Sequence, residues 1–195
     1  MTTIVYLHGF NSGPTSIKAR ALGRAIAALP DSSRPEYFVP RLHYHPTTAM
    51  RAVTAWLQTR EGAALTLVGS SLGGYYATHL AERFAGKAVL INPAIHPYDD
   101  LLPYLGSQTN PYTLERYDLA QDHFAELEAM RVPRIAVPER YLLLVQSGDE
   151  LLDWREAVAF YAGAWQFVEG GGDHAFSSFA SQIPAVLRFA GITST

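Results

Sequence analysis

Residues 69–73 read Gly-Ser-Ser-Leu-Gly, the clearest candidate for chemistry in this 195-residue chain. In the pattern Gly-x-Ser-x-Gly the special serine is Ser71, because Ser70 would need a glycine where Val68 stands. Such a serine sits on a sharp turn between a strand and a helix, with its hydroxyl exposed above the sheet. The pattern therefore predicts that Ser71 is a nucleophile, with negative charge stabilised by the N-terminus of the following helix.

A base is the second requirement, because a serine hydroxyl is a weak nucleophile until a base oriented by a third group activates it. Where a nucleophile occupies such a turn between a strand and a helix, its two partners follow later in the chain, Asp or Glu first and then His. The stretch 165–176 reads WQFVEGGGDHAF, so an apolar run is followed by three glycines and then His174. The glycines permit the turn that would bring an imidazole over Ser71, and His174 is the predicted base.

The orienting acid has four candidates near the ends of the last two apolar runs, Asp149, Glu150, Asp153 and Asp173. Asp149 comes first after the run 141–148, where a short loop can aim it at the site, and it is the predicted partner. The next two acidic residues remain alternatives, although Asp153 could equally cap the helix expected from Trp154. Asp173 is a poor candidate, because neighbouring side chains on an extended loop diverge.

An oxyanion hole needs two backbone N–H groups. One is expected from Leu72, which follows the nucleophile, and the other from Phe10 in the loop after the first apolar run. Gly9 would let that loop approach closely. Asn11 and Ser12 are expected to brace the loop or to contact substrate.

Strands and helices alternate along most of the chain. Six short apolar runs are predicted strands: 3–9, 36–40, 64–69, 87–92, 140–148 and 165–170. Segments with helical spacing are predicted helices: 17–29, 47–60, 72–85, 154–164 and 177–191. Thr47 or Thr48 is the expected N-cap of the second helix, and Pro184 should kink the last one or cost it a hydrogen bond.

This alternation predicts an α/β protein, with a mostly parallel, doubly wound sheet of about six strands covered on both faces. The length suits one domain over residues 1–195. Segment 93–138 breaks the pattern. It is rich in Pro and Tyr and lacks a convincing strand, so we expect a small cap insertion, partly helical around 122–130.

Composition excludes several classes of protein. The net charge is −3 and no basic stripe is visible, so nucleic acid is not an expected partner. The absence of cysteine excludes disulfides and thiolate chemistry. No signal-peptide pattern and no long apolar run are present, so we expect a cytoplasmic protein without a membrane span, as a monomer or weak homodimer.

The remaining histidines suggest structural roles. His43 and His45 form an H-x-H pair, but no third metal ligand is obvious, so a metal site is not expected. His8 is expected to hold the loop geometry by hydrogen bonding rather than to transfer protons. His96 and His123 could line the rim of the pocket but are more often ordinary surface residues.

With these residues in hand, the sequence resembles the α/β-hydrolase superfamily and, more narrowly, the small bacterial YqiA/YcfP-type esterases of the family UPF0227. The resemblance spans residues 6–179 and rests on the stretches YLHGFNSGPTSIKA, LVGSSLGGYYATHLAERF, VLINPAIHPYDDLLPYLG, NPYT, VQSGDELLDWREAVAFY and EGGGDHAFSSF. It implies a serine esterase with the triad Ser71, Asp149 and His174, no cofactor, and acyl esters or thioesters as small-molecule substrates.

Two classes of function follow from these patterns. The first is a serine esterase for short acyl chains, with an acyl-CoA thioesterase as its main variant, since a short, Pro-interrupted cap suggests a small pocket. The second is a catalytically silent homologue that binds a small acyl or hydroxylated ligand. Labelling by a fluorophosphonate probe separates these two classes. A further possibility is a scaffold for partner proteins, which predicts an apolar surface patch on segment 93–138 and no labelling.

Overall fold

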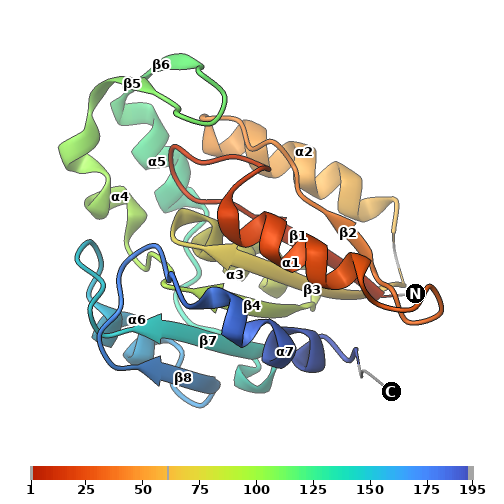
Figure 1. Cartoon of the computed structure of the whole chain (residues 1–195). Helices are drawn as coiled ribbons and strands as arrows, with labels where there is room; N and C mark the ends of the chain where they lie inside the picture. Colours follow the sequence, from red (N-terminus) through yellow and green to blue (C-terminus); the bar gives the residue numbers. More distant parts are fainter. Residues whose placement is uncertain (1, 61, 193–195) are drawn as a thin grey trace.

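A six-stranded parallel sheet forms the centre of the computed structural model, which describes residues 2–60 and 62–192 (Figure 1). Its strands are β1 (Thr2–Leu7), β2 (Glu36–Phe38), β3 (Ala64–Ser70), β4 (Lys87–Ile91), β7 (Tyr141–Gln146) and β8 (Trp165–Glu169). Their order is β2-β1-β3-β4-β7-β8, and every pairing is parallel. The predicted fold class is confirmed.

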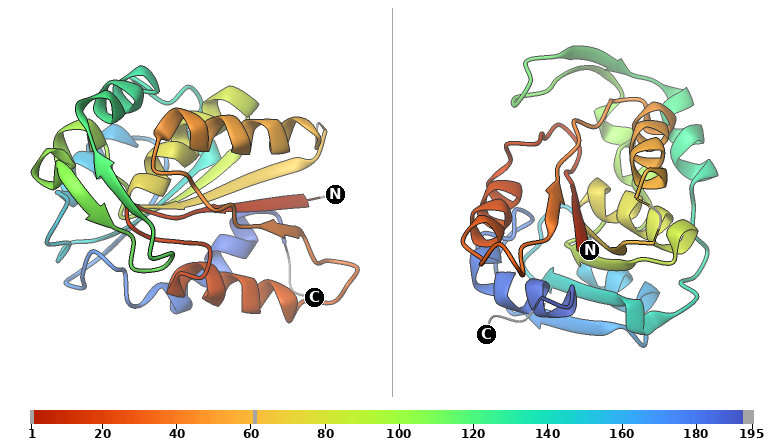
Figure 2. Two further views of the ribbon diagram at one scale, coloured as in Figure 1. Left: turned by 90° about the horizontal axis from the view of Figure 1, so that it is seen from above. Right: turned by 90° about the vertical axis from the view of Figure 1, so that its right-hand side faces the viewer.

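Both faces of the sheet are buried, as the near-continuous apolar strands predict. In β1, Ile4 and Tyr6 belong to one hydrophobic cluster, whereas Val5 and Leu7 belong to another, as alternation in a strand requires. The first cluster is completed by α1 (Ile17–Ala27) and α7 (Phe179–Phe189). The second is completed by α2 (Pro46–Gln58), α3 (Leu72–Phe84), α5 (Gln121–Ala129) and α6 (Trp154–Phe160). Figure 2 shows these helices on the two sides of the sheet.

The predicted helix boundaries lie within four residues of the observed ones, but one N-cap differs. The second helix, α2, begins at Pro46 with His45 as its N-cap, so the expected cap at Thr47 or Thr48 was wrong. Proline suits the first helical position, because its missing N–H has no partner there anyway. Pro184 does lie inside α7, and the helix continues through it to Phe189.

Segment 93–138, the expected cap insertion, has more regular structure than its sequence indicates. It contains α4 (Pro97–Asp100), a 3-10 turn (Leu102–Tyr104), β5 (Gly106–Thr109), β6 (Arg116–Leu119) and α5. The prediction that it lacks a strand was wrong, because β5 and β6 pair as an antiparallel hairpin. Both strands are only four residues long and mostly exposed, so any apolar alternation in them is too short to indicate a strand. The turn between them is stabilised by the Asn110 side chain, which accepts hydrogen bonds from the N–H groups of Tyr112 and Thr113.

The sheet has a switch point between β1 and β3. The chain leaves β1 for β2 on one side and then returns to β3 on the other. In open α/β sheets, ligands bind outside the carboxyl ends of the strands at such a point. The loop after β1 and the turn after β3 therefore meet where a site is expected. Across residues 2–60 and 62–192, no helix combines the length and apolarity needed to cross a bilayer.

Candidate active site

Ser71 lies on a tight elbow between β3 and α3. Its φ of 56° and ψ of −124° are an uncommon backbone conformation for a residue other than glycine. Flanking glycines make the elbow possible: a Cβ on Gly69 would lie 2.1 Å from the Gly73 oxygen, and one on Gly73 would lie 2.0 Å from the Leu7 oxygen. The Ser71 N–H donates to the carbonyl of Ile91 at 3.0 Å, which anchors the elbow to the neighbouring strand.

A chain of hydrogen bonds joins three side chains that are far apart in the sequence. Ser71 Oγ lies 3.1 Å from Nε2 of His174, and Nδ1 of His174 lies 2.9 Å from Oδ2 and 3.0 Å from Oδ1 of Asp149. Because a carboxylate accepts from Nδ1–H, the neutral imidazole presents an Nε2 lone pair to the serine hydroxyl. The arrangement meets the geometric test for an activated nucleophile.

Asp149 is buried and rigidly held. Its side chain is 1 % exposed, against 17 % for His174. Besides the imidazole, Oδ1 accepts the N–H groups of Leu151 and Leu152, each at 2.9 Å. A buried carboxylate needs such partners, because an unpaired one is costly to remove from water.

The three other carboxylates have different partners. Glu150 accepts the backbone N–H of His174 at 2.9 Å, so it positions the loop rather than the imidazole. Asp153 caps α6 by accepting the N–H of Arg155. Asp173 accepts hydrogen bonds from the hydroxyl and the N–H of Ser177. Among these candidates, only Asp149 has a hydrogen bond to the imidazole ring within the described residues.

The backbone amides of Phe10 and Leu72 flank Ser71, and neither has a hydrogen-bond acceptor within residues 2–60 and 62–192. Gly9 brings the first of them close. A Cβ at this glycine would lie only 3.2 Å from the Cβ and 3.7 Å from the Oγ of Ser71. Unpartnered N–H groups beside a nucleophile are what an oxyanion hole requires.

His8 supports this loop with both ring nitrogens. Nε2 accepts the N–H of Leu42 at 3.2 Å, so Nδ1 must carry the proton and donate to the Gly9 carbonyl, 3.1 Å away. Burial lowers the pKa of His8, which favours this neutral form. The expected structural role of His8 is confirmed.

Asn11 and Ser12 connect the loop after β1 (residues 8–16), called the oxyanion loop here for its expected role, to the segment 93–138. The Asn11 amide donates to Gln108 at 3.1 Å and accepts from the Tyr117 hydroxyl at 2.8 Å. The Ser12 carbonyl accepts from the Asn110 amide at 2.8 Å. Both residues thus brace the loop against the β5–β6 hairpin.

Asn92 and Gln146 hold the loop that carries His174, residues 170–178 between β8 and α7, called the histidine loop below. Neither residue was assigned a role from the sequence. The buried Asn92 amide donates to the carbonyls of Asp173 and His174, while its oxygen accepts the Gln146 N–H. The Gln146 side chain accepts the Asp173 N–H and donates to Ser178. Asn92 also has a φ of 40°, a region that asparagine tolerates better than most residues. The sequence did contain one signal for Asn92, namely its position directly after the fourth predicted strand, in the stretch INPA.

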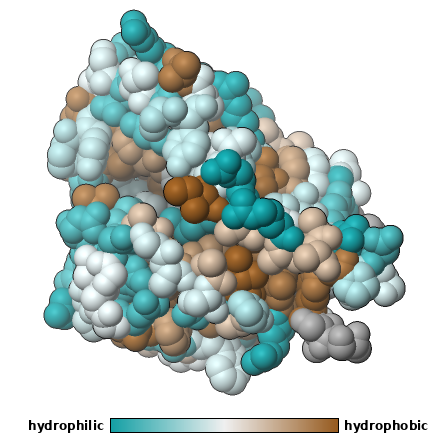
Figure 3. Space-filling model, in the orientation of Figure 1, coloured by the Kyte–Doolittle hydropathy of each residue, from teal (hydrophilic) through white to brown (hydrophobic). Residues whose placement is uncertain are grey.

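Two clefts meet at Ser71 and His174. The apolar cleft, about 340 Å³, is lined chiefly by Leu72, Ala94, Pro97, Leu101, Pro103 and Leu152. Asp100 and Glu150 also border it, and burial, reinforced by nearby Glu156, raises the pKa of Asp100 to about 6. The polar cleft, about 370 Å³, is lined by Ser12, Ser16, Lys18, Tyr112, Ala175 and Ser177. Figure 3 shows this face of the molecule hollowed beside the cap, with hydrophobic side chains around the hollow.

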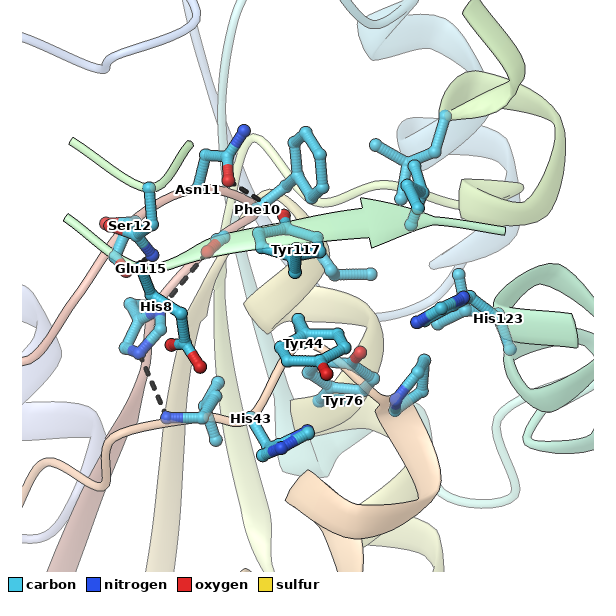
Figure 4. A pocket seen from close by; sticks show the side chains of 18 residues that line it. His8, Phe10, Asn11, Ser12, His43, Tyr44, Tyr76, Glu115, Tyr117 and His123 are labelled. Carbon is cyan, nitrogen blue, oxygen red and sulfur yellow. Dashed lines mark hydrogen bonds between the residues drawn. The ribbon is translucent and has the colours of Figure 1, made fainter. Parts of the chain in front are cut away.

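A third, smaller cavity of about 50 Å³ lies behind the oxyanion loop and does not reach Ser71 or His174 (Figure 4). Stacked rings border it, including Tyr44 on Tyr117 with centroids 4.6 Å apart. His123, expected on a pocket rim or the surface, is buried and lines this cavity. His96, the other such candidate, is half-buried and bonds the Tyr98 hydroxyl.

The H-x-H motif has neighbours that the sequence did not reveal. Ligand atoms of His45, Asp122 and His123 lie within 4.8 Å of one another. The His45 and His123 rings stack, however, with centroids 4.2 Å apart and planes 17° apart. Ring nitrogens bind metals in the plane of the ring, so two stacked rings do not converge on one ion. The arrangement suits ring packing better than a metal centre.

Comparison with known proteins places these features in a family. The family model described as "Uncharacterised protein family (UPF0227)" matches residues 3–191. A UPF0227 protein of Shewanella sp. strain ANA-3 is 27 % identical over 193 residues, covering 95 % of this chain and 98 % of the relative.

Solved structures show the same fold at low identity. Mouse alpha/beta hydrolase domain-containing protein 10 has a TM-score of 0.68 at 17 % identity, covering 95 % of this chain and 89 % of that one. A monoacylglycerol lipase of Paleococcus ferrophilus has a TM-score of 0.67 at 17 % identity, covering 98 % and 96 %. The fold is that of the α/β hydrolases, and the chain belongs to the uncharacterised protein family UPF0227.

Proposed function

We propose that this protein is a serine hydrolase that cleaves carboxylic esters with short acyl chains through an acyl-enzyme. The observation that carries the proposal is the hydrogen-bonded series Ser71–His174–Asp149, with distances of 3.1 Å and 2.9 Å. Its position at the switch point of an α/β-hydrolase fold supports the same reaction class.

In the acylation half-reaction, Ser71 Oγ attacks the ester carbonyl carbon while His174 Nε2 accepts the hydroxyl proton. Asp149 keeps the imidazole in the tautomer that can accept at Nε2 and stabilises the imidazolium that forms. The carbonyl oxygen becomes an oxyanion and accepts from the Phe10 and Leu72 amides. His174 then gives its proton to the departing alcohol oxygen, and the C–O bond breaks.

In the deacylation half-reaction, a water replaces the alcohol and attacks the acyl carbon, with His174 again accepting the proton. The second tetrahedral species collapses as the bond between the acyl carbon and Ser71 Oγ breaks, and His174 returns its proton to Oγ, which releases the acid and regenerates the enzyme. No metal or organic cofactor takes part in these steps.

A fluorophosphonate probe tests the nucleophile directly. The wild-type protein is expected to be labelled, Ser71→Ala to remain unlabelled, and Ser70→Ala, the adjacent matched control, to be labelled. Labelling that survives Ser71→Ala would assign the nucleophile elsewhere. Failure of a folded wild-type protein to react would instead favour a silent ligand-binding homologue.

A substrate panel tests the acyl group and the leaving group. Nitrophenyl esters and acyl-CoAs of graded chain length would be compared by kcat/KM. Short acyl esters are expected to be preferred, because a short cap and the Asp100 side chain border the apolar cleft. A steady rise of kcat/KM with chain length would contradict this, and faster turnover of acyl-CoAs would favour a thioesterase.

A further inference from the structure

Lys18 occupies one wall of the polar cleft, which also contains Ser71 and His174. It lies in the first turn of α1, in a position that the reaction steps above do not use. Its ammonium group donates to the carbonyl of Ala175 at 2.5 Å. This contact directs the cation toward the residue that follows the predicted base.

The Lys18 ammonium lacks an anionic partner within residues 2–60 and 62–192. No carboxylate oxygen of these residues lies within 4.0 Å of Nζ. Burial lowers its pKa, and the carboxylates of Asp173 and Asp149, at longer range, act in the opposite direction. An ammonium has three donors and only one is used here, so the group can still bind an anion.

Ser16 adds a second polar group to the same wall. It is buried, and its hydroxyl has no partner with hydrogen-bond geometry within the described residues, although the Tyr6 hydroxyl is near. It precedes α1, and its side chain does not cap the helix. The first amides of this 11-residue helix therefore leave a positive end at the cleft that carries Lys18.

The apolar cleft differs in the sign of its charged residues. Its charged residues, Asp100 and Glu150, are both acidic, and the rest of its wall is mainly hydrocarbon. An acyl chain gains by leaving water there, whereas a negative group would meet like charge. The two sides of Ser71 therefore favour different halves of a substrate.

We propose that Lys18 forms an anion subsite for the leaving group, so that the protein prefers esters whose alcohol or phenol part carries a carboxylate or a phosphate. This inference rests on the proposed esterase function and deepens it. Lys18 is a specificity residue, and the acyl part occupies the apolar cleft.

The test compares matched acetate esters. The first is 4-acetoxybenzoate, the second its neutral counterpart 4-acetoxybenzamide, and the third 4-acetoxyphenyl phosphate. Phenyl hydrogen succinate places the carboxylate on the acyl side instead. For Lys18→Met, the ratio of kcat/KM for the benzoate over the benzamide is expected to fall about tenfold, as for loss of a charge-assisted hydrogen bond. Comparing this ratio between wild type and variant cancels the difference in intrinsic reactivity between the two esters.

Two further variants complete the design. Lys18→Arg should keep most of the preference, since it keeps the positive charge. Arg20→Met removes the same charge from an exposed position on α1 and should leave the ratio unchanged. The ratio of kcat/KM for the phosphate ester over the benzamide should also fall in Lys18→Met. The anion whose ratio falls further is the preferred one. Thermal unfolding and probe labelling would verify that Lys18→Met remains folded.

Three outcomes would overturn the inference. An equal loss for the benzoate and the benzamide would make Lys18 only a support for the histidine loop. A selective loss for phenyl hydrogen succinate would place the anion on the acyl side. If the probe labels Ser71 but wild type shows no anion preference, the subsite fails while the esterase proposal stands. If neither labelling nor hydrolysis occurs, the proposed function itself fails.

Discussion

The elbow at Ser71 and the β5–β6 hairpin both border the polar cleft, the hairpin through Tyr112 in its turn, but they are built differently. At the elbow, backbone atoms approach so closely that Gly69 and Gly73 have no room for a Cβ. In the hairpin, most residues are exposed, and an added Cβ at Gly106 would meet nothing within 4 Å. The elbow is fixed by backbone packing, whereas the hairpin is held by a few polar side chains.

This contrast separates the roles of the two regions. The proposed nucleophile must be held in a single conformation, and dense packing does this because small displacements in a close-packed region are costly. A cap that shapes the substrate cleft needs only to close over it. Changes in the hairpin should therefore alter substrate preference with little loss of fold, whereas changes at the elbow should destroy both.

The largest expected effect is that of Gly73→Ala. The new Cβ would lie 2.0 Å from the Leu7 carbonyl oxygen, and backbone on both sides cannot move away. We expect a loss of more than about 4 kcal/mol in the free energy of unfolding, or no soluble protein. The hairpin counterpart, Gly106→Ala, meets no atoms but has a φ of 102°, so it should lose only about 1–2 kcal/mol. Urea unfolding of both variants measures the contrast, and equal losses would contradict it.

Asp149→Asn should leave the fold intact but stop the chemistry. The amide would favour the wrong imidazole tautomer, so kcat is expected to fall by about 10³–10⁴-fold. Asp153→Asn, four residues away, alters only a helix cap and should retain activity. Ester hydrolysis by the two purified variants is the measurement. Comparable activity in both would remove Asp149 from the proposed mechanism.

Tyr117→Phe tests the link between hairpin and oxyanion loop. It removes the hydroxyl that donates to Asn11 at 2.8 Å, for an expected loss of about 0.5–1.5 kcal/mol. We expect KM to rise by roughly two- to threefold and kcat to change less, because the hairpin shapes the cleft rather than the elbow. A large fall in kcat with unchanged KM would show that the hairpin positions the reacting groups.

Asp100→Asn gives the most pH-dependent effect. The pKa of Asp100 is raised to about 6, so the carboxyl group stabilises the fold when protonated and destabilises it once ionised. Wild type should therefore lose this contribution as the pH rises from about 4 through 6, whereas the variant should not. The stability advantage of Asp100→Asn should grow across that window and level off above it. Urea unfolding of both proteins between pH 4.5 and 8, a range that spans the pKa of about 6, measures the difference in their free energies of unfolding. A difference that stays constant with pH would exclude the raised pKa of Asp100.

Much of the sheet was readable from the sequence because the central strands β1, β3, β4 and β7 are mostly buried apolar runs, and because Gly69, Gly148 and Gly170 mark strand ends. The order of Ser71, Asp149 and His174 was readable because each follows the end of a predicted strand. The hairpin was not, because its two strands have only four residues each, most of these are exposed, and only Tyr117 and Leu119 are large apolar side chains.

The supporting residues were harder to find. The contacts of Asn92 join β4 to the histidine loop across more than 80 positions of chain, and no local pattern encodes them. Lys18 looked like an ordinary polar position on an amphipathic helix. Only the packing of α1 beside the histidine loop gave it a place in the cleft.

The parallel direction of the strands also matters for experiments. Each of the six begins at the edge of the sheet remote from Ser71, and α7 runs back toward that same edge (Figure 1). Thr2 and Ile192 therefore lie at the rear of the molecule. An affinity tag, a dye or a surface linker joined at either end would point away from the mouth of both clefts, so immobilised protein should still admit ester substrates.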